Sequence, residues 1–356
     1  MPNRDRLRGL LLGTALGDAL GLPMEGMKPH AITRRFPGTR RLAKPEPGER
    51  SPRIDRYFLA GSRGYVSDDT EQAALVAQSL ALGLTQSQTL GLTQSQAPDA
   101  VVAAFRRALR GWFWRLPFGI GLSTLKACLR LSVGLKNSGV RSAGNGATMR
   151  APIVGLVIDD PTQRRALAEA LARVTHTDPR AVEGAVFVTH LAAGASRATP
   201  TADRAVLVAI ARADVRDDAL AAALDHALTA DLETLPTTGF VLNTVALVAR
   251  IFIDHGDDTL EAVRACIRLG GDTDTHAALV GALCGALHGE AGLPTHLIDR
   301  LAHGPFGPTH LRALADALAT GGRPPGFSAA YAMVRNLALY PVILAHGFRR
   351  MWWRVS

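Results

Sequence analysis

Aromatic residues are scarce in this chain: they make up 5% of its 356 residues. A β-sandwich uses more aromatic and β-branched side chains, so an alanine-, leucine- and glycine-rich chain with few aromatics predicts tightly packed helices. Cysteine is also rare. Cys128, Cys266 and Cys284 are far apart, odd in number and set among apolar neighbours. They indicate reduced thiols in a cytoplasmic protein rather than a disulfide framework.

Long hydrophobic runs and long basic tracts are absent as well. The most apolar N-terminal stretch, LLLGTALGDALGL, contains Asp18, shows no signal-cleavage pattern and is too short to span a bilayer. The net charge of +9 comes largely from scattered arginine pairs such as Arg40–Arg41 and Arg106–Arg107. We therefore expect no dedicated nucleic-acid binding, whereas an anionic substrate suits the basic balance.

Helical periodicity runs through most of the chain, and no convincing strand alternation appears. Apolar residues recur at helical spacing over 99–115, and Asp160–Pro161 and Asp178–Pro179 are typical of an N-cap followed by a first helical turn. Further helical patterns cover roughly 203–213, 216–229, 237–254 and 257–269. The prediction is an all-α fold with one large helical domain over residues 1–322.

Glycines recur at every fourth residue in the N-terminal pattern: Gly9, Gly13, Gly17 and Gly21. On a helix they share one face, and a face without side chains lets another helix or a ligand approach closely. Tight helix packing is the favoured interpretation over direct ligand contact.

A linker, GGRPPG at 321–326, separates this domain from an apolar and basic stretch. We predict a C-terminal helical extension over 323–356, in which Pro341 kinks or ends the helix. The extension is expected to dock on the core, on a partner subunit or, through its tryptophans and arginines, on a membrane surface.

Two acidic motifs stand out in this basic chain. The first, SDDTE, contains Asp68, Asp69 and Glu71, and a capping box from Asp68 to Glu71 is its simplest structural explanation. The second, GGDTDTHA, contains Asp272 and Asp274, which would point apart on a regular helix. They can converge only in a turn or at a helix start, and both motifs lie where a loop enters a helix.

Four aspartates brought together would repel one another without a counter-charge. Oxygen ligands from Asp, Ser and Thr suit Mg²⁺, Mn²⁺ or Ca²⁺, whereas zinc prefers His or Cys. Four carboxylates exceed what one Mg²⁺ usually takes from a protein, so a site shared by both motifs favours two metal ions. The sequence alone does not establish that the motifs meet.

Four segments in this order resemble the ADP-ribosylglycohydrolase family: GLLLGTALGDALGLPMEG, GYVSDDTEQAALVAQSL, GNGATMRAP and GGDTDTHAALVGALCGALHG. The resemblance runs from about residue 6 to about residue 290 and implies an all-α fold with two Mg²⁺ or Mn²⁺ ions in a central cleft. It also implies metal ligands and binding residues. The implied ligands are Ser67, Asp68, Asp69, Asp272, Asp274 and Thr275.

The same resemblance implies further roles. Glu25 matches a glutamate that assists catalysis, with Asp68 and Asp69 as the other candidates for the general base. His176 matches a histidine of the nucleotide-binding cleft, and Phe240 stands where relatives place a tyrosine that stacks on the substrate. The loop that would line the ribose and phosphates contains Gly144, Asn145, Gly146 and Met149.

The resemblance implies a hydrolase that removes ADP-ribose from a modified protein side chain, breaking an N- or O-glycosidic bond. The alternatives are a hydrolase of a small ADP-ribose adduct such as O-acetyl-ADP-ribose, and a non-catalytic ADP-ribose-binding or crystallin-like protein. One departure bears on the linkage: some arginine-directed relatives carry an acid two residues before Gly-Asn-Gly, where this chain has Ser142.

Overall fold

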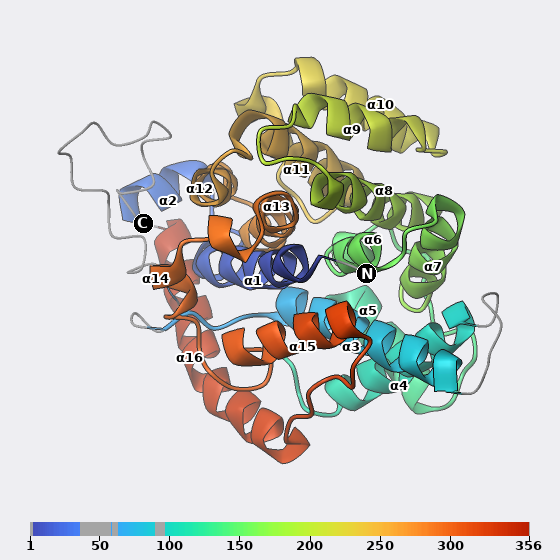
Figure 1. Ribbon diagram of the computed structural model, residues 1–356. Helices are drawn as coiled ribbons and strands as arrows, with labels where there is room; N and C mark the ends of the chain where they lie inside the picture. Colours follow the sequence, from blue (N-terminus) through green and yellow to red (C-terminus); the bar gives the residue numbers. More distant parts are fainter. Residues whose placement is uncertain (1–2, 36–57, 59–62, 90–96, 356) are drawn as a thin grey trace.

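The fold is all-α, as predicted (Figure 1). The computed structural model describes residues 3–35, 58, 63–89 and 97–355, and within these ranges it contains sixteen α-helices and no strand. The helices are α1 Arg4–Gly21, α2 Pro29–Arg35, α3 Asp68–Thr89, α4 Ala97–Phe113, α5 Leu122–Ser132, α6 Pro152–Val157, α7 Pro161–Arg173, α8 Pro179–Arg197, α9 Arg204–Ala213, α10 Asp218–Thr229, α11 Val241–His255, α12 Thr259–Leu269, α13 Thr273–His288, α14 Thr295–Ile298, α15 Pro308–Thr320 and α16 Ala329–Val355.

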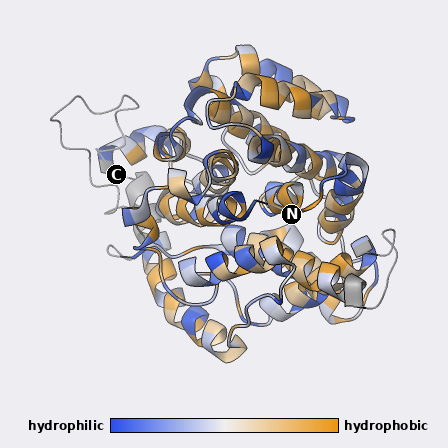
Figure 2. Cartoon of the chain, viewed as in Figure 1, coloured by the Kyte–Doolittle hydropathy of each residue, from blue (hydrophilic) through white to orange (hydrophobic). Residues whose placement is uncertain are grey.

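Short 3₁₀ helices lie between them: η1 Leu22–Met24, η4 Asn145–Ala147, η5 Leu232–Thr234 and η6 Glu290–Gly292. The predicted aspartate caps are confirmed, because Asp160 accepts a hydrogen bond from the Gln163 amide at 2.8 Å and Asp178 from the Arg180 amide at 3.1 Å. Helices α9 and α10 show hydrophilic and hydrophobic residues in alternating patches, the pattern of amphipathic helices at the surface (Figure 2).

Helices α1 and α13 pack against each other at the centre of the molecule (Figure 1). The glycine face of α1 makes this contact, as predicted. A Cβ atom on Gly13 would overlap the carbonyl oxygen of Gly281, and one on Gly17 would overlap that of Ala277. Gly21 meets Thr273 in the same way, so the helices run antiparallel. The end of α1 therefore lies beside the start of α13, where the second acidic motif begins.

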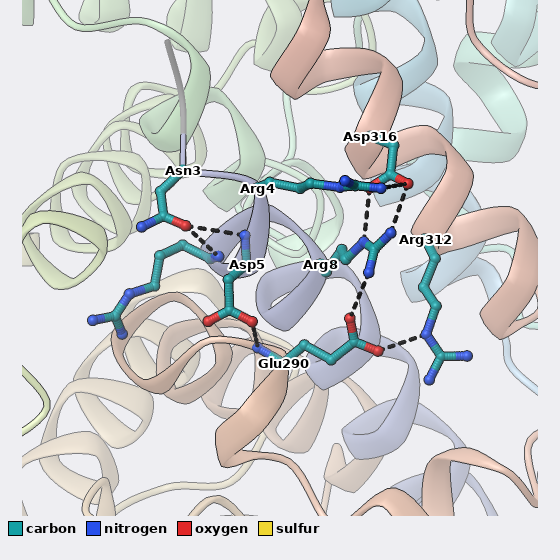
Figure 3. Close-up of polar contacts among 8 residues, drawn as sticks. Asn3, Arg4, Asp5, Arg8, Glu290, Arg312 and Asp316 are labelled. Atoms are coloured by element: carbon teal, nitrogen blue, oxygen red, sulfur yellow. Dashed lines mark hydrogen bonds and ion pairs between the residues drawn. The ribbon is translucent and has the colours of Figure 1, made fainter.

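A polar cluster fixes the other end of α1 (Figure 3). Arg8 donates to Asp316 of α15 at 2.6 Å, and Arg4 donates to the same carboxylate. These arginines hold the pKa of Asp316 well below its ordinary value. Glu290 of η6 accepts from Arg312 at 2.5 Å. The cluster thus connects α1 with η6 and α15.

The C-terminal helix α16 does not end at Pro341, one of the two predicted outcomes, because it continues through that residue from Ala329 to Val355. A proline inside a helix costs about 3 kcal/mol, so contacts on both sides of it must hold α16 helical. Its outward side chains, including Leu337, Leu344 and Phe348, are exposed. Contact of this face with a partner subunit or a membrane surface stays a prediction. In the described part of the chain, no helix is both long and apolar enough to cross a membrane.

Residues 28–64 are rich in proline, glycine and arginine, a composition that predicts a long loop. The short helix α2 interrupts this stretch at its start, and its Ile32 is buried in the core. The rest of that stretch, apart from residues 58, 63 and 64, lies outside the described residues. The sequence LGLTQSQ occurs twice, at 82–88 and at 90–96, and the second copy also lies outside the described residues. The first copy forms the end of α3.

Candidate functional site

One cavity of about 270 Å³ collects most of the residues singled out from the sequence. Both acidic motifs reach it, and they are joined directly: the Thr275 hydroxyl donates to the Asp69 carboxylate at 3.3 Å. The lining residues are Glu25, Asp68, Asp69, Gly119, Gly121, Leu122, Ser123, Thr124, Gly144, Asn145, Gly146, Met149, His176, Gly239, Asp272, Asp274 and Thr275.

The first motif is positioned by an aspartate of another helix. Asp18 of α1 is fully buried and accepts from the backbone N–H groups of Ser67 and Thr70 and from the Thr70 hydroxyl, at 2.9, 3.1 and 2.5 Å. It therefore caps α3 from outside, and its charge suits the positive end of that helix. Burial, offset in part by these hydrogen bonds, raises the pKa of Asp18 to about 6.

The predicted capping box in the first motif is wrong. Glu71 does not reach back to the start of α3; its carboxylate accepts from the Trp112 indole at 2.6 Å and pairs with Arg335. The Ser67 hydroxyl faces Asp69 and does not line the cavity. Tertiary partners thus replace the local capping pattern.

The second motif turns into the site at two glycines. Gly270 and Gly271 have φ angles of 72° and 77°, a left-handed conformation that glycine adopts without strain. Backbone bonds join this turn to the loop after α1, since the Gly26 amide donates to the Gly271 carbonyl at 2.6 Å. The Asp272 carboxylate accepts from the Asn145 amide group at 2.6 Å. The turn therefore brings Asp272, Asp274 and Glu25 to one wall.

The carboxylates of the cavity are held close together although their negative charges repel one another. Burial and then neighbouring acids raise the pKa of Asp68, Asp69 and Asp274 well above the ordinary value. Asp18 is the foremost neighbour of Asp68, Asp68 that of Asp69, and Glu25 that of Asp274. A cation placed among them would lower these pKa values and relieve the repulsion.

The donor set suits a hard cation. The buried Oδ1 atom of Asp69 has no hydrogen-bond partner among the described residues, and the surrounding donors are carboxylate and hydroxyl oxygens. No three His, Cys, Asp or Glu side chains in the described ranges converge closely enough to hold a metal ion by themselves. The residues fit such an ion in donor type and unmet charge, with the hydroxyls of Ser67 and Thr275 as further donors.

Apart from its acids, the lining of the cavity is neutral. His176 lines the cavity, and its ring nitrogen Nδ1 lies 2.8 Å from the Thr175 hydroxyl. Burial, with Arg150 nearby, lowers the pKa of His176 to about 3, so its ring is neutral at physiological pH. Arg150 is itself buried and donates to Gln72 and Thr175 at 2.8 and 2.6 Å. It supports the wall from behind.

Phe240 stands at the edge of the site and is not among the lining residues. Its ring lies under the guanidinium of Arg180, 5.4 Å from ring centroid to Cζ. The backbone before Phe240 belongs to the cavity wall: Gly239 lines the cavity, and its carbonyl accepts from the Asn145 backbone amide at 3.0 Å. Sequence reasoning missed Asp18 and the residues 119–124, although an acid inside an apolar glycine-patterned helix is a signal for Asp18.

The helical fold, the cavity and the order of its motifs agree with a comparison to known families, in which the model of the ADP-ribosylglycohydrolases matches residues 1–326. The chain belongs to the ADP-ribosylglycohydrolase family. The matched part contains every candidate site residue and ends before α16 begins.

Two named relatives of this ADP-ribosylglycohydrolase are hydrolases. A glycohydrolase of ADP-ribosyl-dinitrogen reductase from Rhodospirillum rubrum is 24% identical, covering 83% of this chain and 90% of the relative. An ADP-ribosylarginine hydrolase from Pseudomonas putida is 25% identical, covering 88% and 78%. A solved ADP-ribosylglycohydrolase-related protein superposes with a TM-score of 0.64 at 26% identity, covering 89% of this chain and 98% of that one. The chain is thus a hydrolase by family.

Proposed function

We propose that this ADP-ribosylglycohydrolase is a metal-dependent hydrolase that removes ADP-ribose from a modified protein side chain by cleaving the N- or O-glycosidic bond at C1″. The observation that carries the proposal is the contact between Thr275 and Asp69, which unites acids from distant parts of the chain in one cavity. A purely structural role does not account for several buried carboxylates whose charges are left uncompensated by protein groups.

The proposed cofactor is a pair of Mg²⁺ ions, or Mn²⁺ ions, held by Ser67, Asp68, Asp69, Asp272, Asp274 and Thr275. The chemistry that such ions supply when bound is orientation of the ribose hydroxyls and acidification of a water molecule. Asn145 would keep the Asp272 carboxylate in place, because its side-chain amide donates to that carboxylate at 2.6 Å and also to the Thr244 hydroxyl at 3.0 Å.

The residues of the cavity would divide the remaining tasks. Glu25 is half-buried in the wall beside Asp274 and is the proposed base that takes the proton of the attacking water, with Asp68 and Asp69 as alternatives. Gly144 and Gly146 leave room for the ribose and phosphates close to the backbone. The neutral His176 and Met149 would line the nucleotide side, and Phe240 would offer a ring at its edge.

Incubation with an ADP-ribosylated protein tests the proposal. Purified protein should release ADP-ribose in the presence of Mg²⁺ and lose this activity in EDTA. Release only from O-acetyl-ADP-ribose would favour the small-adduct alternative. Binding of ADP-ribose without release under any condition would leave a non-catalytic binding or crystallin-like protein.

A single substitution tests whether both acidic motifs serve one site. Asp272→Ala should abolish most of the activity and lower the amount of bound Mg²⁺, although it lies far from Asp68 and Asp69 in sequence. Asp257→Ala, on the exposed loop before α12, is the matched control and should change neither. Full activity and metal content in Asp272→Ala would exclude a shared site.

We further propose that residues 1–322 form the catalytic domain and that 323–356 form a helical extension. The proposed location is the cytoplasm, in line with three buried free thiols. An ADP-ribosylated protein, or a small molecule that contains ADP-ribose, is the expected substrate, without dedicated nucleic-acid binding.

A further inference from the structure

Helix α16 contacts the loops and the helix that carry site residues, although it follows the part of the chain that matches the family. That part ends at residue 326, and α16 begins at Ala329. Its outward side chains are exposed, whereas Asn336 and Leu339 on the inward side are buried. Each group of inward contacts described below includes a polar contact to a loop or helix that carries cavity residues.

The first contact is with the loop that contains Glu25. The Nε2 atom of His346 lies 2.8 Å from the Pro23 carbonyl oxygen, to which its N–H can donate. Leu339 packs against Leu22 in a small buried apolar cluster. Pro23 precedes Glu25 by two residues, so α16 fixes the loop from which Glu25 enters the cavity.

The second contact is with the loop between α4 and α5. Asn336 donates to the Arg115 carbonyl at 2.8 Å, and the Tyr340 hydroxyl donates to the Pro117 carbonyl at 3.2 Å. Between these two carbonyls, Leu116 has a φ of 56°, a left-handed conformation that is unfavourable for a non-glycine residue. Such a conformation persists where surrounding contacts enforce it, and α16 supplies two of them.

This second loop forms part of the cavity wall beside an acid. At Gly119 a Cβ atom would lie 2.7 Å from the Asp68 carboxylate, so the loop backbone is in close contact with the first acidic motif. Phe118 joins the same apolar cluster as Leu339. A shift of this loop would therefore change the space around Asp68.

The third contact is electrostatic. Arg335 pairs with the buried Glu71, which shares the first turn of α3 with Asp68 and Asp69. Arg335 also donates to the Pro305 carbonyl at 3.0 Å, which holds its guanidinium in place. Its positive charge offsets the third acid of this turn.

We propose that α16 is a positioning element of the active site, which holds the Glu25 loop and the 115–121 loop in register with the first acidic motif. This inference rests on the proposed function for its effect on turnover, but not for its effect on the two loops. Residues of α16 touch neither the cavity nor its acids, so they act through the backbone that they fix.

The test uses the full chain with His346→Ala and Tyr340→Phe combined, which removes two hydrogen bonds to loop carbonyls and no charge from the cavity. We expect amide hydrogen exchange in 22–27 and 115–121 to become about tenfold faster, with exchange in α1 and α13 unchanged. ADP-ribose release should fall about tenfold, mainly in kcat. His346→Gln, which keeps a side-chain N–H donor, should restore protection of 22–27.

Val334→Ser with Leu344→Ser, on the exposed side of the same helix, is the matched control and should leave both loops protected. Unchanged exchange in the two loops of the double variant would overturn the proposal, and so would equally faster exchange in α1 and α13, which marks general loss of stability. A wild-type protein that releases no ADP-ribose would refute the proposed function alone, because loop exchange is measured without substrate.

Discussion

The contact between α1 and α13 differs sharply from the cavity at its end. Along the helices, the glycine faces are in such close backbone contact that a Cβ atom on either would overlap the other helix. The neighbouring apolar side chains are fully buried. At the end of the same pair, Asp18 and Asp274 sit buried among other acids. One region satisfies the rules of packing throughout, and the other violates the rule that buried charges are paired.

This difference indicates the role of the tightly packed contact between α1 and α13, which is to hold the acids in place. Buried like charges persist only where the surrounding structure prevents them from moving apart. The antiparallel glycine contact fixes the end of α1 against the start of α13 without flexible side chains between them. The comparison therefore predicts that substitutions in the helix pair lower the stability of the fold. Substitutions of the acids should abolish activity and raise the stability of the metal-free protein.

The largest effect is expected from Gly17→Val. Its side chain would overlap the Ala277 carbonyl, and backbone cannot move aside as a side chain can, so we expect a loss of about 3 kcal/mol or more and little soluble protein. Gly347→Ala is the control, because this helical glycine has open space around its Cα and its replacement should be neutral or mildly stabilising. Thermal unfolding of both variants gives the answer; a stable Gly17→Val protein would mean that the helices are not in contact as described.

Asp69→Asn should separate stability from function. Removal of one buried charge lowers the repulsion with Asp68, so the metal-free variant should be about 1 kcal/mol more stable than the wild type. Activity with Mg²⁺ should fall more than about a hundredfold, since even an indirect contact to a metal is often worth that much. Denaturant unfolding in EDTA and release assays measure the two effects. A less stable metal-free variant would show that the carboxylate is structurally compensated.

The pH dependence of stability gives a second measure of the strained region. Folding raises the pKa of Asp18 to about 6. It also raises the pKa values of Asp68, Asp69 and Asp274. The folded state then binds more protons than the unfolded state above about pH 4, so the stability of metal-free protein should fall as pH rises from about 4 through 6. Asp316 has a lowered pKa, and its contribution is lost only at lower pH.

Thermal melts in EDTA between pH 5 and 8 check this prediction, and added Mg²⁺ should flatten the curve. Asp69→Asn is the control, because it should reduce the slope. A metal-free protein that grows more stable toward pH 8 would contradict the assignment of strain to these acids.

The sequence predicted the features that depend on local patterns. The four-residue glycine interval identified a packing face, and proline after aspartate identified the starts of α7 and α8. It also placed both acidic motifs at helix starts. Their convergence follows once α1 is paired with α13 and Asp18 of α1 caps the start of α3. The family resemblance supplied the order of the motifs, which no single spacing could provide.

The rest depends on contacts between distant segments. Glu71 has the spacing of a capping box, yet Trp112 and Arg335 take its carboxylate, and neither is near it in sequence. Pro341 could have ended the helix, but side chains on both sides of it are anchored to loops, and the helix continues. A local pattern cannot show such partners, so it describes what a segment prefers alone.

Asn145→Ala should have a moderate effect within the cavity. It removes the amide group that donates to the Asp272 carboxylate at 2.6 Å and so loosens a proposed metal ligand, and kcat/KM should drop about tenfold. Asn243→Ala, whose amide bonds Thr238 outside the cavity at 2.8 Å, is the control. Equal losses in both variants would indicate that the loop, and not the contact to Asp272, matters.

Phe240→Leu should have the smallest effect and tests how far the site extends. The backbone around it is held independently of the ring, because the Val241 amide donates to the Ala143 carbonyl at 2.9 Å. Stacking of a base on an aromatic ring is worth about 1–3 kcal/mol. Because Arg180 already covers part of the Phe240 ring, we expect the lower end of this range. KM should therefore rise about fivefold with kcat unchanged. Phe240→Tyr keeps the ring and should behave as wild type in the same steady-state assay. If Phe240→Leu lowered kcat instead, the ring would help to position the cavity residues around Asn145. The site would then extend beyond its lining residues.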